Sequence, residues 1–275
     1  MNSINTNYGA MIALQNLNAI NAELIATQKR ISTGLKVSSA KDNGAVWAIA
    51  QNQRSEVSAL DAVTESLSRN SSVVDVALSA GETVSDLLME LKEKALAASD
   101  TTINTFSRDA LKADFEAIRN QIARTVQYAS FNGINLLNGS KTSISALANA
   151  KGTDSFTIAA QNMSLGGGLI TLSAGASFSS ATAAASLISS LEASIGNVSS
   201  ALSRLGTSHK ALDRHTTFIG KLQDTLTASI GRLVDADLAV ESTRLQALQV
   251  KQQLAIQSLA ISNSAPSYLL KLFGG

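Results

Sequence analysis

Apolar residues recur at helical spacing over most of the chain. Near the N-terminus they come every seven residues, with others at intermediate positions of the same face: Ala10, Leu17, Leu24 and Ile31, with Leu14, Ile20 and Leu35. This spacing predicts a long amphipathic helix. We expect it to end near Gly34, since glycine favours the conformation that terminates helices. The polar segment VSSAKDNG then precedes a second helical stretch, which begins around Ala45.

Helical spacing continues well beyond that point. It runs from Ala45 to about Ser99 with Gly81 as its one break, and from about Arg108 to Ala129 after the polar segment SDTTINTFS. It returns at Thr182 and extends to about Asn263, with an interruption expected between Gly206 and Thr217. More than 50 residues of helix without proline is unusual for a globule and ordinary for a coiled coil or rod.

The last helical stretch carries a second apolar series with seven-residue spacing. Its members are Leu226, Leu233, Val240, Ala247, Leu254 and Ile261, beside a neighbouring row of Leu238, Leu245 and Leu259. Both ends of the chain are therefore amphipathic, and one thin hairpin cannot bury both stripes completely. We expect association with copies of the chain or with a partner helix.

The middle of the chain has a different texture. Residues 131–180 are rich in Gly, Ser, Thr and Asn, and the segments SFTIAA and LITLSA alternate between apolar and polar residues. Alternation of this kind, with pairs such as Asn132-Gly133 between, predicts short strands and turns. We expect Gly166 to Gly168 to form a turn. The predicted fold is mainly α, a long antiparallel helical rod or coiled coil with a small β-hairpin insertion.

Composition narrows the function classes. Among 275 residues, 45% are hydrophobic but only 4% are aromatic, the net charge is +1 and cysteine is absent. The balanced charge gives no attraction to nucleic acid, and the lack of cysteine excludes thiolate metal sites and cysteine nucleophiles. No apolar run approaches the length of a membrane span, and the N-terminus lacks the basic region of a cleavable signal peptide. We therefore expect neither nucleic-acid binding nor membrane insertion.

No motif of known chemistry stands out, so we expect no catalytic, cofactor-binding or metal site. His209 and His215 are six residues apart, which places them on opposite sides of a helix, and we expect partly exposed residues near a helix break. Asp235 and Asp237 do not face each other on a helix, so they are interpreted as helix-surface carboxylates. Trp47 is expected to anchor helices against one another. The lysines at 92, 94 and 112 alternate with acids, which is typical of a solvated face.

Several segments together resemble bacterial flagellins of the alphaproteobacterial kind. They are SINTN near the N-terminus, RISTGLKVSSAKDNGA from Arg30 to Ala45, FNGINLLNGS from Phe131 to Ser140, and DADLAVESTRLQALQVKQQLAIQSLAISNSAPSYLLKLF from Asp235 to Phe273. These motifs keep the family's order and spacing over roughly the first 140 and last 80 residues. Where the family often has two acidic residues and then Ala-Ala-Gly, this chain has Asp42-Asn43 and then Gly44-Ala45-Val46, a modest departure.

The resemblance implies five parts. Residues 1–40 would hold an inner-tube helix and linker, 41–130 and 182–233 the two parts of a helical rod domain, 131–181 a short variable segment, and 234–275 the C-terminal inner-tube helix. In flagellins the terminal helices are disordered in the free subunit and pair as a coiled coil only in the filament. We therefore expect a thin filament with small surface hairpins.

The resemblance also implies the functional residues and the partners. Inter-subunit coiled-coil packing would involve Ala10, Leu14, Leu17, Leu24, Ile31, Leu238, Leu245, Leu248, Leu254, Leu259, Leu269, Leu270 and Leu272. The expected partners are other copies of the chain, the flagellar export apparatus and its chaperone, and the cap and hook-filament junction proteins. The expected location is the extracellular filament, where the chain serves as a propeller for swimming.

One stretch departs from the pattern by which an innate immune receptor recognises some flagellins. Glu90 stands where that pattern has Arg, and Lys94 replaces a Leu. Because the first change reverses a charge, we expect weak or no recognition.

Three other readings stay open from the sequence. A hook-filament junction protein would form short adaptors and not long polymers. A soluble enzyme would need a titratable cluster or cofactor site that the sequence does not reveal. A secreted helical adhesin or effector would not self-assemble into filaments.

Overall fold

The computed structural model describes the backbone of residues 6–273 and the side chains of residues 6–264. Its helices and strands follow the chain as α1 (Tyr8–Thr33), α2 (Gly44–Ser99), α3 (Thr105–Tyr128), β1 (Ser130–Phe131), β2 (Ile134–Asn135), β3 (Ser143–Leu147), β4 (Ser155–Ala159), α4 (Ala181–Val234) and α5 (Leu238–Phe273). They form two compact units: unit 1 comprises residues 1–55 and 225–275, and unit 2 comprises residues 56–224. The predicted class, mainly α with a small β insertion, is confirmed.

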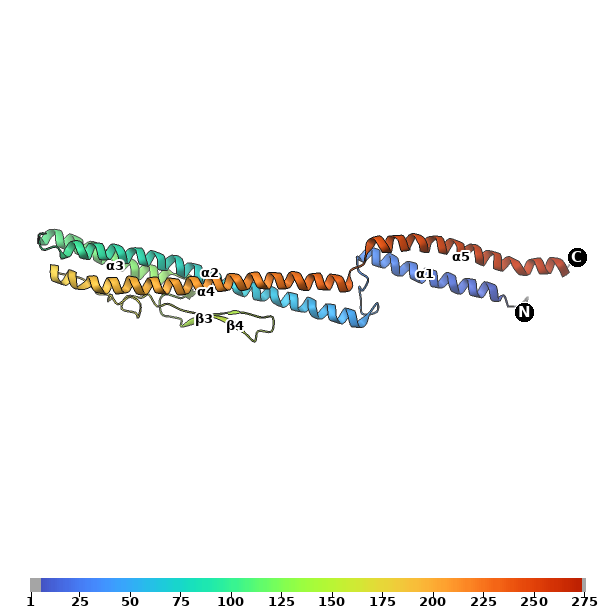
Figure 1. Ribbon diagram of the computed structural model, residues 1–275, viewed down its shortest axis with the longest axis horizontal. Helices are drawn as coiled ribbons and strands as arrows, with labels where there is room; N and C mark the ends of the chain where they lie inside the picture. Colours follow the sequence, from blue (N-terminus) through green and yellow to red (C-terminus); the bar gives the residue numbers. More distant parts are fainter. Residues whose placement is uncertain (1–5, 274–275) are drawn as a thin grey trace. The chain divides into compact units, whose positions relative to one another are not determined.

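Unit 1 is dominated by α1 and α5, which lie side by side and antiparallel (Figure 1). Asn7 caps the start of α1 by accepting a hydrogen bond from the amide of Ala10 at 3.0 Å. Gly34 ends the helix as predicted, in the left-handed conformation with φ 70°, and its N–H donates to the Arg30 carbonyl. Asp237 caps α5 by accepting from the amides of Ala239 and Val240.

In unit 2 the helices α2, α3 and α4 run along one another, with the β3–β4 hairpin against them (Figure 1). The core side chains repeat at helical spacing and are completely or almost completely buried, among them Leu60, Leu67, Leu88, Leu91, Phe115, Ile122, Leu191 and Leu205. Phe115 meets Phe178 edge to face, with ring centroids 5.3 Å apart. Gly81 lets α2 and α4 approach closely, since a Cβ there would lie 2.6 Å from the Leu202 side chain.

Two antiparallel hairpins follow α3. Asn132 and Gly133, with φ 51° and 77°, form the predicted turn between β1 and β2, where both central residues have positive φ. The side chain of Asn135 is buried. Its Nδ2 donates to the Val126 carbonyl and its Oδ1 accepts from the backbone amide of Leu137, which joins this hairpin to the end of α3. The second hairpin pairs β3 with β4, the strand predicted from SFTIAA.

Three predictions of local structure are wrong. LITLSA is not a strand, although Ile170 and Leu172 point inward, because its backbone bonds to α4: Thr171 N–H donates to Ser194 Oγ, and Asn197 Nδ2 donates to the Leu169 carbonyl. The turn at Gly166 is present, with its φ at 72° and its N–H donating to the carbonyl of Leu172.

The second wrong prediction is the interruption between Gly206 and Thr217. The α4 helix continues through it because Leu205, Leu212 and Ile219 keep their buried face. The break lies instead at Asp235 to Asp237, so the third wrong prediction is that these two are helix-surface carboxylates. There the carbonyl of Gly34 accepts from the amide of Ala236 at 2.9 Å.

Candidate assembly surface

One seam at heptad spacing holds α1 against α5. Buried and half-buried positions are three and four residues apart on both helices, which turns one face of each helix towards the other. They are Ala10, Ala13, Leu17, Ile20, Leu24, Thr27 and Ile31 on α1, and Glu241, Leu245, Leu248, Gln252, Ala255, Leu259 and Ser262 on α5. Half of these side chains are small or polar, so the seam buries little apolar area for its length.

A charged pair crosses the seam near its closed end. Arg30 Nη1 donates to Glu241 Oε1 at 3.0 Å, and the two side chains are 37% and 10% exposed. The second carboxylate oxygen of Glu241 is buried and has no hydrogen-bond partner among the described residues. Removing Arg30 would leave a buried, unpaired charge, so the pair specifies which residues meet.

Two further polar contacts lie towards the open end. Gln252 Nε2 donates to Asn21 Oδ1 at 2.7 Å, and Asn7 Nδ2 donates to the backbone carbonyl of Ser262 at 2.6 Å. A shift of either helix by one turn would break both contacts. Together with the charged pair they set the antiparallel register of the hairpin.

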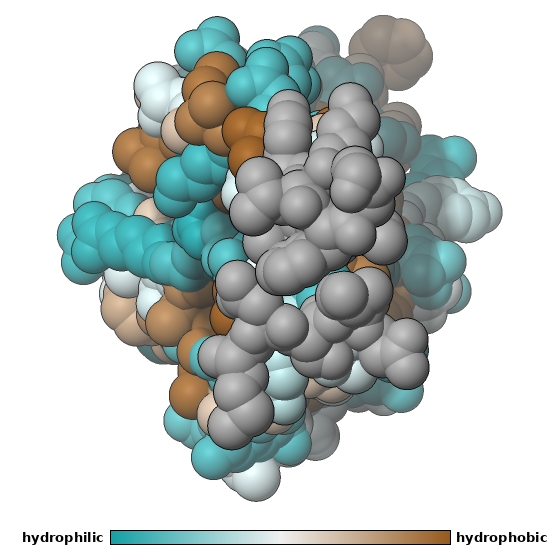
Figure 2. Space-filling model, turned by 90° about the vertical axis from the view of Figure 1, so that its right-hand side faces the viewer, coloured by the Kyte–Doolittle hydropathy of each residue, from teal (hydrophilic) through white to brown (hydrophobic). Residues whose placement is uncertain are grey.

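The surface of the hairpin outside the seam, which we call its outer face, carries exposed apolar residues on several sides of the two helices. Its exposed large apolar side chains are Met11, Ile12, Leu14 and Ile25 on α1, and Leu238, Val240, Val250, Leu254, Ile256 and Ile261 on α5. Figure 2 views the molecule from the side on which the two chain ends lie, and hydrophobic residues there reach the surface between hydrophilic ones. Exposed apolar residues in such number are typical of an interaction surface.

A groove between the two helices adds depth to this surface. Its volume is about 440 Å³, and its lining includes Ala13 and Ile20 from α1 and Leu248 and Leu254 from α5. Glu23 and Lys251 belong to the lining as well. Because the lining mixes apolar, polar and charged residues, it suits a helix that offers residues of each kind.

The predicted packing residues fall into three groups. The side chains of Ala10, Leu17, Leu24, Ile31, Leu245, Leu248 and Leu259 lie in the seam within the chain. Those of Leu14, Leu238 and Leu254 are 49%, 50% and 58% exposed and point outward. Leu269, Leu270 and Leu272 have side chains outside the described residues.

Sequence reasoning missed the polar members of the seam. Thr27, Glu241 and Gln252 occupy seam positions. The prediction from apolar residues alone selected instead a series whose members are exposed: Val240, Ala247, Leu254 and Ile261. The signal was present, because extending the three-and-four spacing from Leu245 and Leu248 reaches Glu241 and Gln252 directly.

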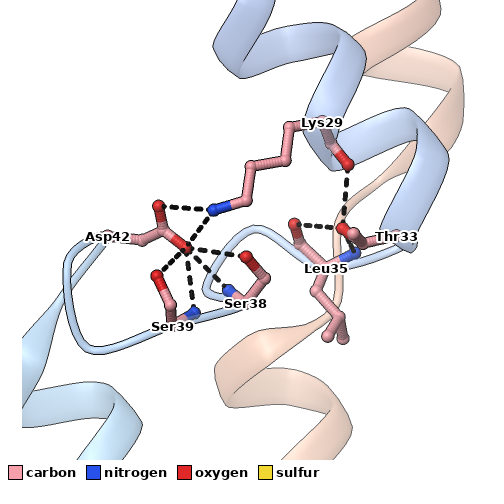
Figure 3. Close-up of polar contacts among 6 residues, drawn as sticks. All are labelled: Lys29, Thr33, Leu35, Ser38, Ser39 and Asp42. Atoms are coloured by element: carbon pink, nitrogen blue, oxygen red, sulfur yellow. Dashed lines mark hydrogen bonds and ion pairs between the residues drawn. The ribbon is translucent and has the colours of Figure 1, made fainter.

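The linker between α1 and α2 folds around one carboxylate (Figure 3). Asp42 Oδ2 accepts hydrogen bonds from the backbone amides and hydroxyls of Ser38 and Ser39, at 2.9 to 3.1 Å, and Lys29 Nζ donates to both Asp42 oxygens at 3.2 Å. The hydrogen bonds from Ser38, then that from Lys29, hold the pKa of Asp42 well below its usual range.

This linker also meets the one between α4 and α5. The amides of Lys36 and Val37 both donate to the carbonyl of Val234, and Lys36 Nζ donates to the carbonyl of Arg232. Leu35 and Asp235 form a single β-bridge. The seam, the charged pair and the paired linkers therefore position α1 and α5 as one element.

The histidines of unit 2 make separate structural contacts. His209 Nε2 lies 3.0 Å from Ser71 Oγ and 2.8 Å from Asp75 Oδ1, and its Nδ1 lies 3.2 Å from Asp213 Oδ2. Ser71, His209 and Asp213 thus lie in the order of a hydrolase triad. Ser71 is in the middle of α2, however, where the backbone amides are hydrogen-bonded within the helix and cannot form an oxyanion hole. His215 Nε2 lies 2.7 Å from the carbonyl of Ala148.

Other predicted polar residues take part in contacts between helices. Lys92 pairs with Glu192 of α4 at 2.8 Å, and Lys94 pairs with Asp114 of α3 at 3.5 Å, so both link helices across the rod face. Trp47 is half-buried near the start of α2. Within residues 6–264 no group of three metal-ligating side chains occurs, and no helix described here is long and apolar enough to cross a membrane.

Comparison with known proteins places these features in a family. The family model for the bacterial flagellin N-terminal helical region matches residues 4–142, and that for the C-terminal helical region matches residues 188–273. The chain is 52% identical to Flagellin FljM of Caulobacter vibrioides over 99% of both chains. It is 34% identical to a flagellin of Brucella melitensis over the whole of both chains.

Solved structures agree at the level of the fold. A crystal structure of Bacillus cereus flagellin matches with a TM-score of 0.50 and 20% identity, covering 56% of this chain and 88% of that one. A putative flagellar hook-associated protein from Vibrio parahaemolyticus matches with a TM-score of 0.60 and 12% identity, covering 70% and 100%. Both likenesses concern the arrangement of helices alone.

Proposed function

The chain belongs to the bacterial flagellin family, and we propose that it polymerises into the flagellar filament by packing the outer face of its α1–α5 hairpin against neighbouring copies. The observation that carries this proposal is the distribution of apolar residues on the hairpin. Its seam is half small or polar, whereas ten large apolar side chains stand exposed outside the seam.

Burial of these outer side chains supplies the driving force. Each fully buried leucine or isoleucine contributes roughly 1.5 to 3 kcal/mol. Ordering the two helices costs conformational entropy, which a seam of this composition offsets only weakly. Folding of α1 and α5 is therefore coupled to assembly. In this scheme Leu14, Leu238 and Leu254 contact other copies, while Leu17, Leu24 and Leu248 hold the hairpin together.

The remaining parts of the proposal follow from family membership. The chain is exported by the flagellar export apparatus with a chaperone, assembles beneath the cap protein on the hook-filament junction proteins, and works outside the cell as a propeller for swimming. Its role is structural and not enzymatic. The five-part division at residues 1–40, 41–130, 131–181, 182–233 and 234–275 belongs to the same proposal.

Weak recognition by the innate immune receptor, expected from Glu90 and Lys94, is also part of the proposal. Glu90 is exposed on α2, and Lys94 is engaged by Asp114. A carboxylate in place of a guanidinium opposes the charge that the receptor's contact requires. A receptor reporter assay with the purified chain should give little or no signal, and Glu90→Arg should increase it if this position controls recognition.

Polymerisation by purified protein tests the main proposal. Negative-stain electron microscopy of the full chain, seeded with filament fragments, should show long uniform filaments, and a variant lacking residues 1–34 should form none. Leu254→Asp places a charge on the outer face and should also abolish filaments. Lys151→Asp adds negative charge at an exposed position of the β3–β4 turn, outside the α1–α5 hairpin, and as the control should polymerise normally.

Two results would contradict the proposal. Normal filaments from Leu254→Asp would show that the outer face of the hairpin is not buried in the polymer. Short adaptors that never elongate, from the unaltered chain, would favour the hook-filament junction alternative.

A further inference from the structure

Unit 2 carries an exposed aromatic side chain at one end. The first turn of α3 presents Phe106 with 84% of its surface exposed, whereas Phe115 on the same helix is completely buried. Asp109, one turn further along α3, is also exposed. The end of the unit therefore offers an aromatic ring beside a carboxylate.

Several hydrogen bonds join the start of α3, which carries Phe106, to the turn before it. Asn104 Oδ1 caps α3 by accepting from the Ser107 amide at 2.7 Å. The Arg108 guanidinium donates to the carbonyls of Ala98 and Asp100, at 3.1 and 2.9 Å, and is therefore engaged by the backbone of the turn. These hydrogen bonds hold the backbone that carries Phe106, so docking of this segment orders less of the chain.

A groove elsewhere in unit 2 has the complementary character. It lies between α2 and the two hairpins, has a volume of about 310 Å³, and its lining includes the apolar residues Val73, Phe131, Ile134 and Ile144. Arg69 and Lys141 are part of the same lining. The groove thus combines apolar and aromatic side chains with two cations, of which Arg69 also pairs with Glu65 at 3.5 Å.

A polymer that grows without closing needs two different, complementary surfaces on every copy. Resting on the filament function proposed above, we propose that Phe106 of one copy inserts into this groove of the next copy, with Asp109 facing Arg69 and Lys141. Aromatic anchors in pockets with complementary charge are the usual centres of interfaces.

The geometry also predicts a spacing. The groove residues Asn70 and Val73 precede Asp100, at the level of the turn, by 27 to 30 residues along α2. At the rise of an α-helix this is about 40 to 45 Å. Copies joined by this contact should therefore repeat at about that distance along the direction of α2.

A pair of cysteines tests the contact directly, because the chain has no cysteine of its own. Thr105→Cys combined with Ser145→Cys places thiols beside Phe106 and in the groove lining, too far apart within one chain for a disulfide, and leaves both cations in place. Oxidised filaments of this variant should give a ladder of covalent oligomers, and the unpolymerised chain should give none. Each single-cysteine variant should give no ladder, which is the control.

Truncation of the anchor gives a second measurement. Phe106→Ala should raise the critical concentration for polymerisation at least about tenfold, as expected for loss of an interface anchor. Phe218→Ala removes a different exposed phenylalanine of unit 2, 56% exposed, and should leave the critical concentration unchanged. Asp109→Lys should weaken assembly, and adding Lys141→Glu should restore part of it.

The outcomes separate this contact from the filament function itself. If the unaltered chain forms no filaments, the proposed function fails and this contact fails with it. If filaments form but the cysteine pair gives no ladder, or if Phe106→Ala polymerises like Phe218→Ala, only the docking of Phe106 is wrong.

Discussion

The cores of the two units differ in what fills them. In unit 2 the inward positions of the helices are large and apolar, and Leu67, Leu88 and Phe115 are completely buried. In unit 1 the corresponding positions of the α1–α5 seam include Thr27 and Glu241 among the most buried. Both units are built from long helices. The core of unit 2 is sufficient to hold its helices together, whereas that of unit 1 needs further partners.

This difference separates stability from assembly. A chain whose terminal helices were held by a core like that of unit 2 would fold completely before reaching its place in a polymer. A polar seam with apolar residues outside makes the final packing depend on neighbouring copies. The contrast predicts that substitutions in the core of unit 2 change the melting of the free chain, whereas those in the hairpin change mainly the polymer.

The largest expected effect on the free chain is at Phe115. Phe115→Ala removes a completely buried ring that meets Phe178, and should cost about 3 to 5 kcal/mol of unfolding free energy. For a unit of this size the melting temperature, followed by circular dichroism, should fall by roughly 6 to 20 °C. Phe106→Ala, on the same helix but exposed, is the control and should change it little. Equal melting of the two variants would remove the contrast between core and surface.

A smaller effect is expected at the charged pair of the seam. Arg30→Met leaves the buried carboxylate of Glu241 without its partner, and should destabilise the polymer by about 1 to 3 kcal/mol per subunit. This is less than for a fully buried pair, because the Arg30 side chain is 37% exposed. The readout is the temperature at which filaments disassemble, with the melting of unit 2 in the free chain unchanged.

A double substitution tests whether the unpaired charge of Glu241 causes the expected loss of filament stability. Arg30→Met with Glu241→Met replaces the pair by apolar side chains and should recover most of the lost filament stability. If the double variant disassembles at the same temperature as Arg30→Met, or lower, the isolated charge of Glu241 is not the cause.

The sequence predicted the helices well because their signals are local and repeated. Apolar residues at helical spacing and Gly34 at a helix end sufficed for α1, α2 and α3. It failed at LITLSA, where alternation was correct for burial but the hydrogen-bond partners came from α4. Alternation reports which side chains are buried and says nothing of what the backbone pairs with.

The same limit applies to the hairpin. Apolar spacing identified Leu245, and extending the three-and-four spacing reaches Glu241, but a glutamate is expected at the surface unless its partner is known. That partner, Arg30, lies 211 residues away in the chain. A contact between residues so far apart in the sequence depends on the register of the two helices, which cannot be derived from a single sequence.

The smallest expected effect concerns the linker that joins the seam to α2. The hydrogen bonds of Ser38, Ser39 and Lys29 lower the pKa of Asp42, so they stabilise the folded linker while the carboxylate is ionised. This stabilisation is complete above the ordinary pKa of aspartate, about 4, and is lost as the pH falls from there towards the lowered value. The amides of Ser38 and Ser39 should therefore exchange slowly with solvent near neutral pH in filaments.

Hydrogen exchange measured on filaments at several pH values checks this. After correction for the intrinsic rate, protection of these two amides should decline only below pH of about 4, and Asp42→Asn should remove most of it at every pH. Asp237→Asn is the control, because it alters a different cap and should leave the Ser38 and Ser39 amides protected. Protection that is the same in Asp42→Asn and the unaltered chain would mean that the linker is held by its contacts to Val234 and not by the carboxylate.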